Sequence, residues 1–196
     1  RERWTQVKDG LGQVVLLSGE PGIGKSRLVQ ELRGRVAHEE HVRLECRCSS
    51  YHQNSALYPV IDLLQRVLRF RREDPPQEKL GKLEAALAHD HVPLPDVVPL
   101  FAALLSLPLP DRSPPLTLTP QRQRQKTLEA VVGTLLAMAA RQPVLFSIED
   151  LHWADPSTLE ALSLAMDQTP TARLLIVLTG RPEFHPPWAM RAHLTH

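Results

Sequence analysis

The feature that most constrains this chain is a short apolar segment that runs directly into a glycine-rich loop and then into an amphipathic segment. Residues 13–17 (Q-V-V-L-L) are typical of a buried parallel strand. From Lys25 to Glu40, Leu28, Leu32 and Val36 recur on one face of a predicted helix. A strand, a tight loop and a helix in this order begin a βαβ unit, so the sequence predicts a parallel sheet covered by helices on both faces.

The rest of the chain continues this alternation. Its 196 residues match the length of one domain, about 100–200 residues, and we predict a single domain over 1–196. Apolar runs predict further strands at 41–46, 144–148 and 171–179, and helical spacing or a capping signal predicts helices at 1–8, 57–71, 77–88, 121–141 and 156–168. Asp155-Pro156 is typical of a helix start.

A proline-rich segment interrupts the pattern at about 72–120. Eight of the 18 prolines lie between 92 and 120. Proline fixes φ and lacks an N–H donor, so this stretch can form neither a long helix nor a central strand. We expect an irregular lobe inserted into the domain, with two helical turns at 100–107.

Composition gives no support for several classes of partner. Lys and Arg total 23 against 22 for Asp and Glu, a net charge of +1, so there is no electrostatic footprint for nucleic acid or an anionic membrane. No run of about 18 apolar residues is present. We therefore expect a cytoplasmic domain that contacts neither a membrane nor nucleic acid directly, with Cys46 and Cys48 as reduced thiols.

The glycine-rich loop matches a phosphate-binding pattern in full. Residues 19–26 (G-E-P-G-I-G-K-S) fit G-x-x-x-x-G-K-[ST], with a strand before them and a helix after them. Lys25 is placed to reach β- and γ-phosphates, and the Ser26 hydroxyl to bind Mg²⁺. The alternative is a glycine-rich turn that matches the phosphate-binding pattern by chance. The predicted nucleotide-binding residues are Gly19, Glu20, Pro21, Gly22, Ile23, Gly24, Lys25, Ser26 and Arg27.

Two adjacent acids, Glu149 and Asp150, follow the strand predicted at 144–148. Such a site needs one carboxylate to hold Mg²⁺ and can use a second to polarise the attacking water. Register gives Glu149 the metal position, but side chains alternate along a strand and the division of roles stays open. Both acids are candidate Mg²⁺ ligands and catalytic residues, against the alternative of two solvated acids at a strand end.

Arg181 follows the strand predicted at 171–179. In the commonest arrangement of such sheets, this strand lies between the one before the loop and the one before the acids. Arg181 would then face the γ-phosphate, where it can sense the triphosphate or stabilise transition-state charge. The alternative is an ordinary surface arginine. We favour local packing for the neighbouring His152, and expect Trp153 to anchor the 150–155 connection.

Four blocks together resemble a known family: G-E-P-G-I-G-K-S-R-L (19–28), S-S-Y-H-Q-N-S-A-L-Y-P-V-I (49–61), E-D-L-H-W-A-D-P-S-T-L-E (149–160) and T-G-R-P-E-F (179–184). They are similar to the ATPase module of STAND-type signalling NTPases in the bacterial AAA group. That module follows class III adenylate/guanylate cyclase domains and precedes tetratricopeptide repeats, and occurs in LuxR-type regulators. The resemblance implies a three-layer α/β/α P-loop NTPase fold.

The resemblance also implies a function. It points to a switch that binds ATP and Mg²⁺, is on with ATP and off with ADP, and hydrolyses ATP slowly. Its partners would be the attached output and repeat domains, with nucleotide-dependent oligomerisation. Carried over, Gly19, Gly24, Lys25 and Ser26 hold phosphate and Mg²⁺, the two acids form the acidic site, and Arg181 is the sensor arginine.

The chain departs from the family pattern at both ends. A glycine-arginine-glutamate segment that helps hold adenine is absent, and we expect the fifth strand, helical lid and winged helix beyond His196. Other readings stay open: a motor ATPase acting on nucleic acid or protein, a small-molecule phosphotransferase, and a scaffold with a degenerate site. ATP is favoured over GTP, because no guanine-reading N-K-x-D motif is present.

Overall fold

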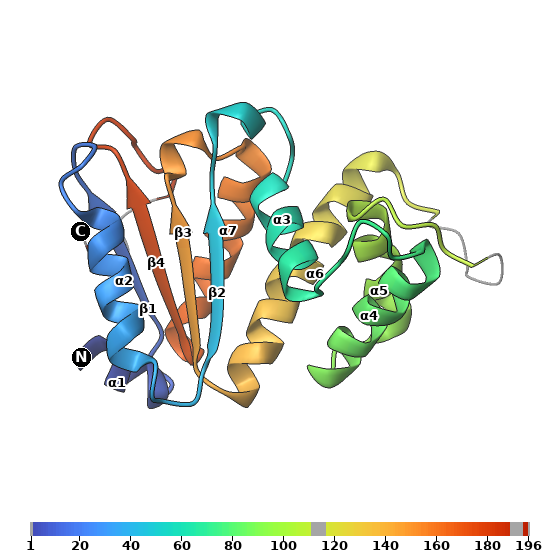
Figure 1. The fold of residues 1–196 in the computed structure, drawn as a ribbon, viewed down its shortest axis with the longest axis horizontal. Coiled ribbons are helices and arrows are strands. Elements are labelled where there is room, and N and C mark those ends of the chain that lie inside the picture. Colours follow the sequence, from blue (N-terminus) through green and yellow to red (C-terminus); the bar gives the residue numbers. More distant parts are fainter. Residues whose placement is uncertain (1, 111–116, 189–193, 196) are drawn as a thin grey trace.

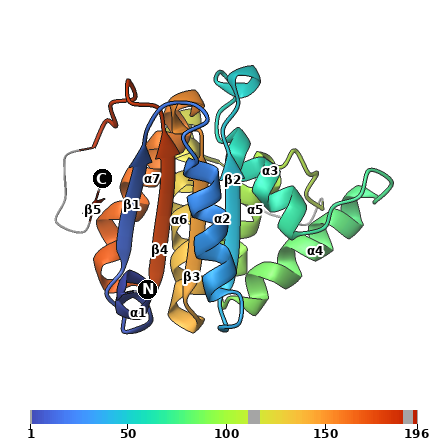
Figure 2. The ribbon, with the colours of Figure 1, turned by 60° about the vertical axis from the view of Figure 1, so that its left-hand side comes forward.

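Five parallel strands form the centre of the fold. The computed structural model describes residues 2–110, 117–188 and 194–195. Figure 2 shows the strands side by side in the order β2-β3-β4-β1-β5, and Figure 1 shows β1 to β4 of this sheet. Because β4 lies between β1 and β3, the strand order expected from the sequence is confirmed. The strands are β1 (Gln13–Ser18), β2 (Val42–Arg47), β3 (Val144–Glu149), β4 (Leu174–Gly180) and β5 (Leu194–Thr195).

The last strand corrects one expectation. We placed the fifth strand beyond His196, but β5 pairs in parallel with Val14 and Val15 of β1 inside the chain. The edge of β1 is therefore partly covered. The sequence signal was missed because only two residues pair, which is too short for an apolar run to stand out.

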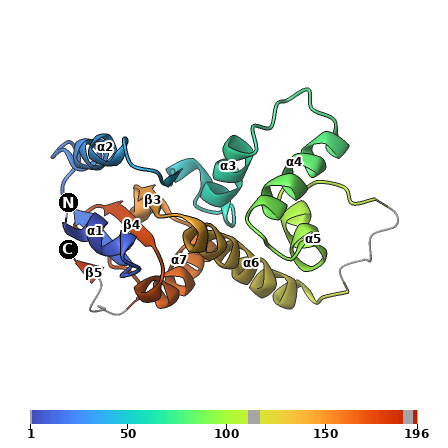
Figure 3. The ribbon, with the colours of Figure 1, turned by 90° about the horizontal axis from the view of Figure 1, so that it is seen from below.

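Helices cover the sheet on both faces, so the predicted three-layer α/β/α arrangement is confirmed (Figure 3). Within the described ranges, no helix is both long and apolar enough to cross a bilayer. One face packs against α1 (Glu2–Lys8) and α2 (Lys25–Val36), and the other against α3 (Tyr58–Val67), α6 (Pro120–Arg141) and α7 (Pro156–Gln168).

Side-chain alternation along the strands divides the core into these two layers. On β3, Phe146 and Ile148 face α6 and α7, whereas Leu145 belongs to the smaller cluster under α1 and α2. Burying apolar side chains on both faces is what a central parallel strand requires. Cys46 and Cys48 are free thiols buried in the larger cluster. Burial raises the pKa of both, to about 12 for Cys48, so they are packing residues.

Helix α2 presents to the sheet a face slightly rotated from the one expected. Of the predicted stripe, Val36 is buried and Leu32 packs partly buried against the cluster under α1 and α2, but Leu28 is 59% exposed and Val29 is buried in its place. The helix begins at Lys25, directly after Gly24 in a left-handed conformation. Val29, Leu32 and Val36 form the buried stripe, and Arg33 lies beside it with a side chain that is 13% exposed.

The proline-rich lobe is more helical than expected. It contains α4 (Pro76–His89), which confirms the helix predicted at 77–88, and α5 (Leu94–Leu104). Their apolar side chains form a cluster of their own beside α6 (Figure 1). The two turns predicted at 100–107 are wrong in extent, because α5 starts at Leu94 and continues through Pro99. An interior proline costs about 3 kcal/mol, which the burial of Val97, Val98 and Phe101 offsets.

Asp155 joins two parts of the chain that are distant in sequence. Its carboxylate is 2% exposed and caps α7, as predicted, by accepting hydrogen bonds from the backbone N–H groups of Ser157 and Thr158, each at 3.0 Å. It also accepts the backbone N–H of Leu57, at 3.1 Å. Leu57 has φ 57°, a strained value for a leucine, at the start of α3.

We expect Asp155→Ala to lower the free energy of unfolding by about 2–4 kcal/mol, because the helix cap is lost and buried N–H donors lose their acceptor. Urea unfolding followed by circular dichroism measures the change. Asp155→Asn retains one acceptor oxygen and should lose less, and Asp96→Ala, an exposed residue of α5, should have little effect. Equal losses in all three variants would contradict the role given to Asp155.

Candidate nucleotide-binding site

The loop between β1 and α2 has the backbone geometry of an anion cradle. Gly22 and Gly24 have φ of 80° and 104°, values that side chains rarely adopt. Gly24 is also the N-cap of α2, and no side chain caps the helix. The first N–H groups of a helix have no partner within it, so this end of α2 offers donors and the positive end of the helix dipole to an anion.

Lys25 lies over this loop. Its ammonium group donates to the carbonyl oxygens of Gly19, at 2.6 Å, and Glu20, at 2.9 Å. Among the described residues it forms no ion pair with a carboxylate. The positive charge of Lys25 is therefore not neutralised. A phosphate carries full negative charge, so it can displace the two carbonyl oxygens, which carry only partial charge. This is the position that the sequence predicted for a phosphate-binding lysine.

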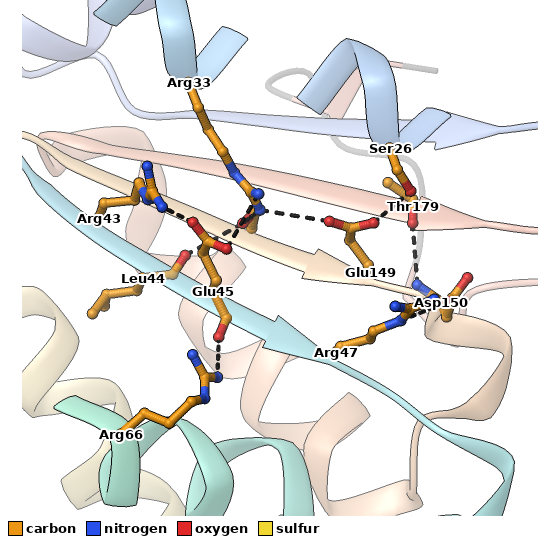
Figure 4. Close-up of polar contacts among 11 residues, drawn as sticks. Ser26, Arg33, Arg43, Leu44, Glu45, Arg47, Arg66, Glu149, Asp150 and Thr179 are labelled. Atoms are coloured by element: carbon orange, nitrogen blue, oxygen red, sulfur yellow. Dashed lines mark hydrogen bonds and ion pairs between the residues drawn. The ribbon is translucent and has the colours of Figure 1, made fainter. Parts of the chain in front are cut away.

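Ser26 and Glu149 are in direct contact. The Ser26 hydroxyl, in the first turn of α2, donates to Glu149 Oε2 at the end of β3, at 2.6 Å (Figure 4). Two of the three side chains that the sequence selected for Mg²⁺ thus meet although they are 123 residues apart. Among the described residues, no group of three or more His, Cys, Asp or Glu side chains could hold a metal. One or two carboxylates beside substrate phosphates is the usual protein share of a Mg²⁺ site, and this pair fits it.

Asp150 is turned away from this pair. It has φ 61°, and its carboxylate forms an ion pair with Arg47 at the end of β2, 3.1 Å from Nε (Figure 4). Its backbone N–H donates to the Thr179 hydroxyl, at 3.1 Å. A left-handed conformation is strained for a residue with a side chain, and such strain is often found at functional sites. The two acids therefore point in different directions.

Arg181 follows β4 and rests on Trp153. Its guanidinium carbon is 5.5 Å from the centroid of the indole ring, within cation–π range, and its Nη1 is 3.8 Å from Glu183 Oε1. Trp153 packs against the larger core cluster, as the sequence predicted. The structure thus holds Arg181 beside the η2 turn (Leu151–Trp153), which follows the acids.

His152 lies among the charges of this site. Both ring nitrogens are shielded from solvent and have no hydrogen-bond partner within the described chain. Burial lowers the pKa of His152, and the nearby positive charge of Arg181 lowers it further. The sequence favoured a packing role for His152, and a neutral, shielded ring agrees with that role.

The remaining predicted loop residues are open to solvent. Glu20, Pro21, Gly22 and Arg27 are exposed, and the Ile23 side chain is 69% exposed. Gly19 and Gly24 are half-buried. The loop is therefore accessible to a ligand along its length.

Sequence reasoning missed three residues that contact the acids: Arg33, Arg47 and Thr179. Arg33 carried a usable signal, since a charged residue spaced four from Val29 and three from Val36 sits on an apolar helical stripe. Arg47 and Thr179 stand at strand ends, where the carboxyl edge of a parallel sheet gathers polar side chains. Neither residue was distinguishable from other polar residues at strand ends without the strand order.

Comparison with known proteins places this chain in a family. Residues 1–177 match the AAA ATPase domain. The chain belongs to the AAA ATPase domain family. An uncharacterized protein of Rhizobium meliloti (strain 1021) is 30% identical over 199 residues, which cover 98% of this chain and 18% of that protein. This AAA domain thus spans under a fifth of the length of that relative.

Solved structures are more distant. Drosophila ORC bound to AT-rich DNA and Cdc6 is 10% identical, with a TM-score of 0.40, over 96% of this chain and 47% of that chain. cbiO1 from Clostridium perfringens, part of the ABC transporter complex cbiONQ, is 14% identical, with a TM-score of 0.34, over 86% of this chain and 67% of that chain.

We expect the pKa of His152 to lie below 6.5 in the folded domain, because its ring is desolvated and Arg181 is near. Arg181→Ala should raise that pKa, since the largest of the charge effects that lower it is removed. NMR titration of the histidine ring protons measures both values. Because the folded-state pKa is lowered, the stability contributed by neutral His152 is present above pH 6.5 and is lost as the pH falls from there through the folded-state pKa. A pKa above 6.5, or one unmoved in Arg181→Ala, would contradict this geometry.

Proposed function

We propose that this AAA domain is a nucleotide-dependent switch that binds ATP with Mg²⁺, hydrolyses it slowly and regulates an output domain of the same polypeptide. The observation that carries the proposal is the contact between Ser26 and Glu149 beside the uncapped start of α2 and the free charge of Lys25. Phosphate donors, a cation and a metal-binding pair therefore lie together at one edge of the sheet. Phosphoryl transfer from a nucleotide uses these three groups together.

Each group has a role in this proposal. The N–H groups of the loop and Lys25 bind the phosphates, with Lys25 exchanging the carbonyls of Gly19 and Glu20 for phosphate oxygens. Ser26 and Glu149 hold the metal. Mg²⁺ bound there supplies charge neutralisation of the β- and γ-phosphates.

The position of Asp150 supports slow hydrolysis. Its carboxylate is paired with Arg47 rather than directed toward Ser26. To polarise a water near the phosphates, Asp150 has to leave this ion pair. The enzyme class we propose is therefore an ATPase of low turnover, in which the bound triphosphate persists long enough to act as a signal.

Arg181 provides a route from the nucleotide to the rest of the protein. It rests on Trp153, whose ring also packs against the core. A γ-phosphate attracts the guanidinium more strongly than an aromatic face does, so ATP and ADP would leave Arg181 in different positions. We propose that attached output and repeat domains, cyclase-like or regulator-like, read this difference, with nucleotide-dependent oligomerisation as one outcome. The relative's much greater length leaves room for such domains.

Thermal unfolding tests whether the loop binds nucleotide. Mg-ATP at about 100 times its Kd stabilises a protein by roughly 2.7 kcal/mol. For a chain of this size, we expect Tm to rise by roughly 5–11 °C with Mg-ATP, with a rise also for Mg-ADP. Lys25→Ala should abolish both shifts, because the phosphates lose their cation.

Lys126→Ala is the matched control. Lys126 is exposed on α6 and pairs only with Glu129 of the same helix among its described contacts, so its removal should leave the shifts intact. An unchanged shift in Lys25→Ala would place binding elsewhere. The absence of any shift in the unsubstituted protein would refute nucleotide binding by this domain.

A further inference from the structure

Arg33 is a charged residue on the buried side of a helix. It lies in the middle of α2, between Val29 and Val36, and its side chain is 13% exposed. Arginine is rarely buried unless its charge is paired, so the partners of Arg33 indicate why it is there. It has no place among the groups expected to touch nucleotide.

The guanidinium group contacts three side chains on two strands (Figure 4). Nη2 donates to the Ser147 hydroxyl, at 2.7 Å, and lies 3.5 Å from Glu149 Oε1. Nη1 lies 3.2 Å from Glu45 Oε2. The planar fork of an arginine reaches several acceptors at fixed angles, which a lysine ammonium on its flexible stem does not reproduce.

The pleat of the sheet explains why these partners coincide. Ser147 and Glu149 are two residues apart on β3 and therefore share a face. Glu45 of β2 pairs in register with Ser147, which brings it to the same face. Arg33 reaches down from α2 onto this face and joins the two strands.

These contacts divide the two oxygens of Glu149 between different partners. Oε1 faces Arg33 and Oε2 accepts the hydrogen bond of Ser26. We propose that Arg33 is a positioning residue for the metal-binding carboxylate: it holds Glu149 in the rotamer that turns Oε2 toward Ser26. The proposal rests on the proposed function, since it assigns Arg33 to the Mg²⁺ pair of that site.

Glu45 makes this arrangement compatible with a cation. The positive charge of Arg33 alone would oppose a metal ion at Glu149. Glu45 is paired with both Arg33 and Arg43, so it compensates part of the Arg33 charge within the cluster. Arg33 can then act mainly through the geometry of its hydrogen bond to Ser147 and its ion pair with Glu149.

Arg33→Lys tests the proposal, since it retains the charge and removes the fork. The measurement is binding of a fluorescent ATP analogue, with Mg²⁺ titrated from zero, in EDTA and in excess Mg²⁺. We expect the half-saturating Mg²⁺ concentration to rise about 10-fold, because loss of a group that orients a metal ligand weakens metal binding by that order. Affinity for the analogue in EDTA should not change, because Arg33 does not contact the phosphate loop.

Three further variants separate positioning from a structural effect. Arg35→Lys, on the exposed side of the same helix, should leave the Mg²⁺ dependence unchanged. Ser147→Ala removes one partner of Arg33 without removing its charge, and should raise the half-saturating Mg²⁺ concentration by a smaller factor in the same direction. Glu149→Gln should abolish the effect of Arg33→Lys, because the two substitutions act on the same oxygen atoms.

Two results would overturn this inference and leave the proposed function standing. One is a normal Mg²⁺ dependence in Arg33→Lys together with Mg²⁺-dependent binding by the unsubstituted protein. The other is an equal effect of Arg33→Lys in the presence and absence of Glu149. If Arg33→Lys does not fold, a normal Mg²⁺ dependence in Ser147→Ala decides against the inference. Failure of the unsubstituted protein to bind the analogue would instead refute the proposed function, and the inference with it.

Discussion

The hydrogen bond from Ser26 to Glu149 depends on the order of the strands. Adjacent parallel strands lie about 4.8 Å apart, and only β4 separates β1 from β3. The phosphate loop at the end of β1 and the acids at the end of β3 therefore come within reach of each other's side chains. An order with more strands between β1 and β3 would place these residues farther apart. The strand order thus brings the two segments close together, and the side chains of Ser26 and Glu149 span the remaining distance.

Charge on one face of the sheet is the second constraint. Helix α2 buries apolar residues over β1, β4 and part of β3, while β2 presents Arg43 and Glu45 on that side. Arg33 lies at the boundary between these apolar and polar areas. Buried charges have to be compensated, and here the compensating partners include the carboxylate next to the phosphate loop. Packing of α2 and geometry of the candidate metal site are therefore coupled through one side chain.

Local patterns predicted β1 to β4, and the commonest arrangement of such sheets placed β4 between β1 and β3. Ser26 and Glu149 were both selected for Mg²⁺, and this strand order brings them into contact. In α2 the pattern placed Leu32 and Val36 correctly but chose Leu28 over its equally apolar neighbour Val29. The first half of α5 was missed because its prolines argued against a helix, whereas burial of its apolar side chains outweighs that local cost.

The division of roles between the two acids is the central claim about the site. The alternation of side chains along the strand left open which of the two acids holds Mg²⁺. In the structure, Glu149 contacts Ser26 and Asp150 contacts Arg47. The most direct test compares the Mg²⁺ dependence of nucleotide binding in Glu149→Gln and Asp150→Asn. The account predicts a half-saturating Mg²⁺ concentration raised at least about 10-fold in Glu149→Gln and unchanged in Asp150→Asn. A large rise in Asp150→Asn with none in Glu149→Gln would contradict it.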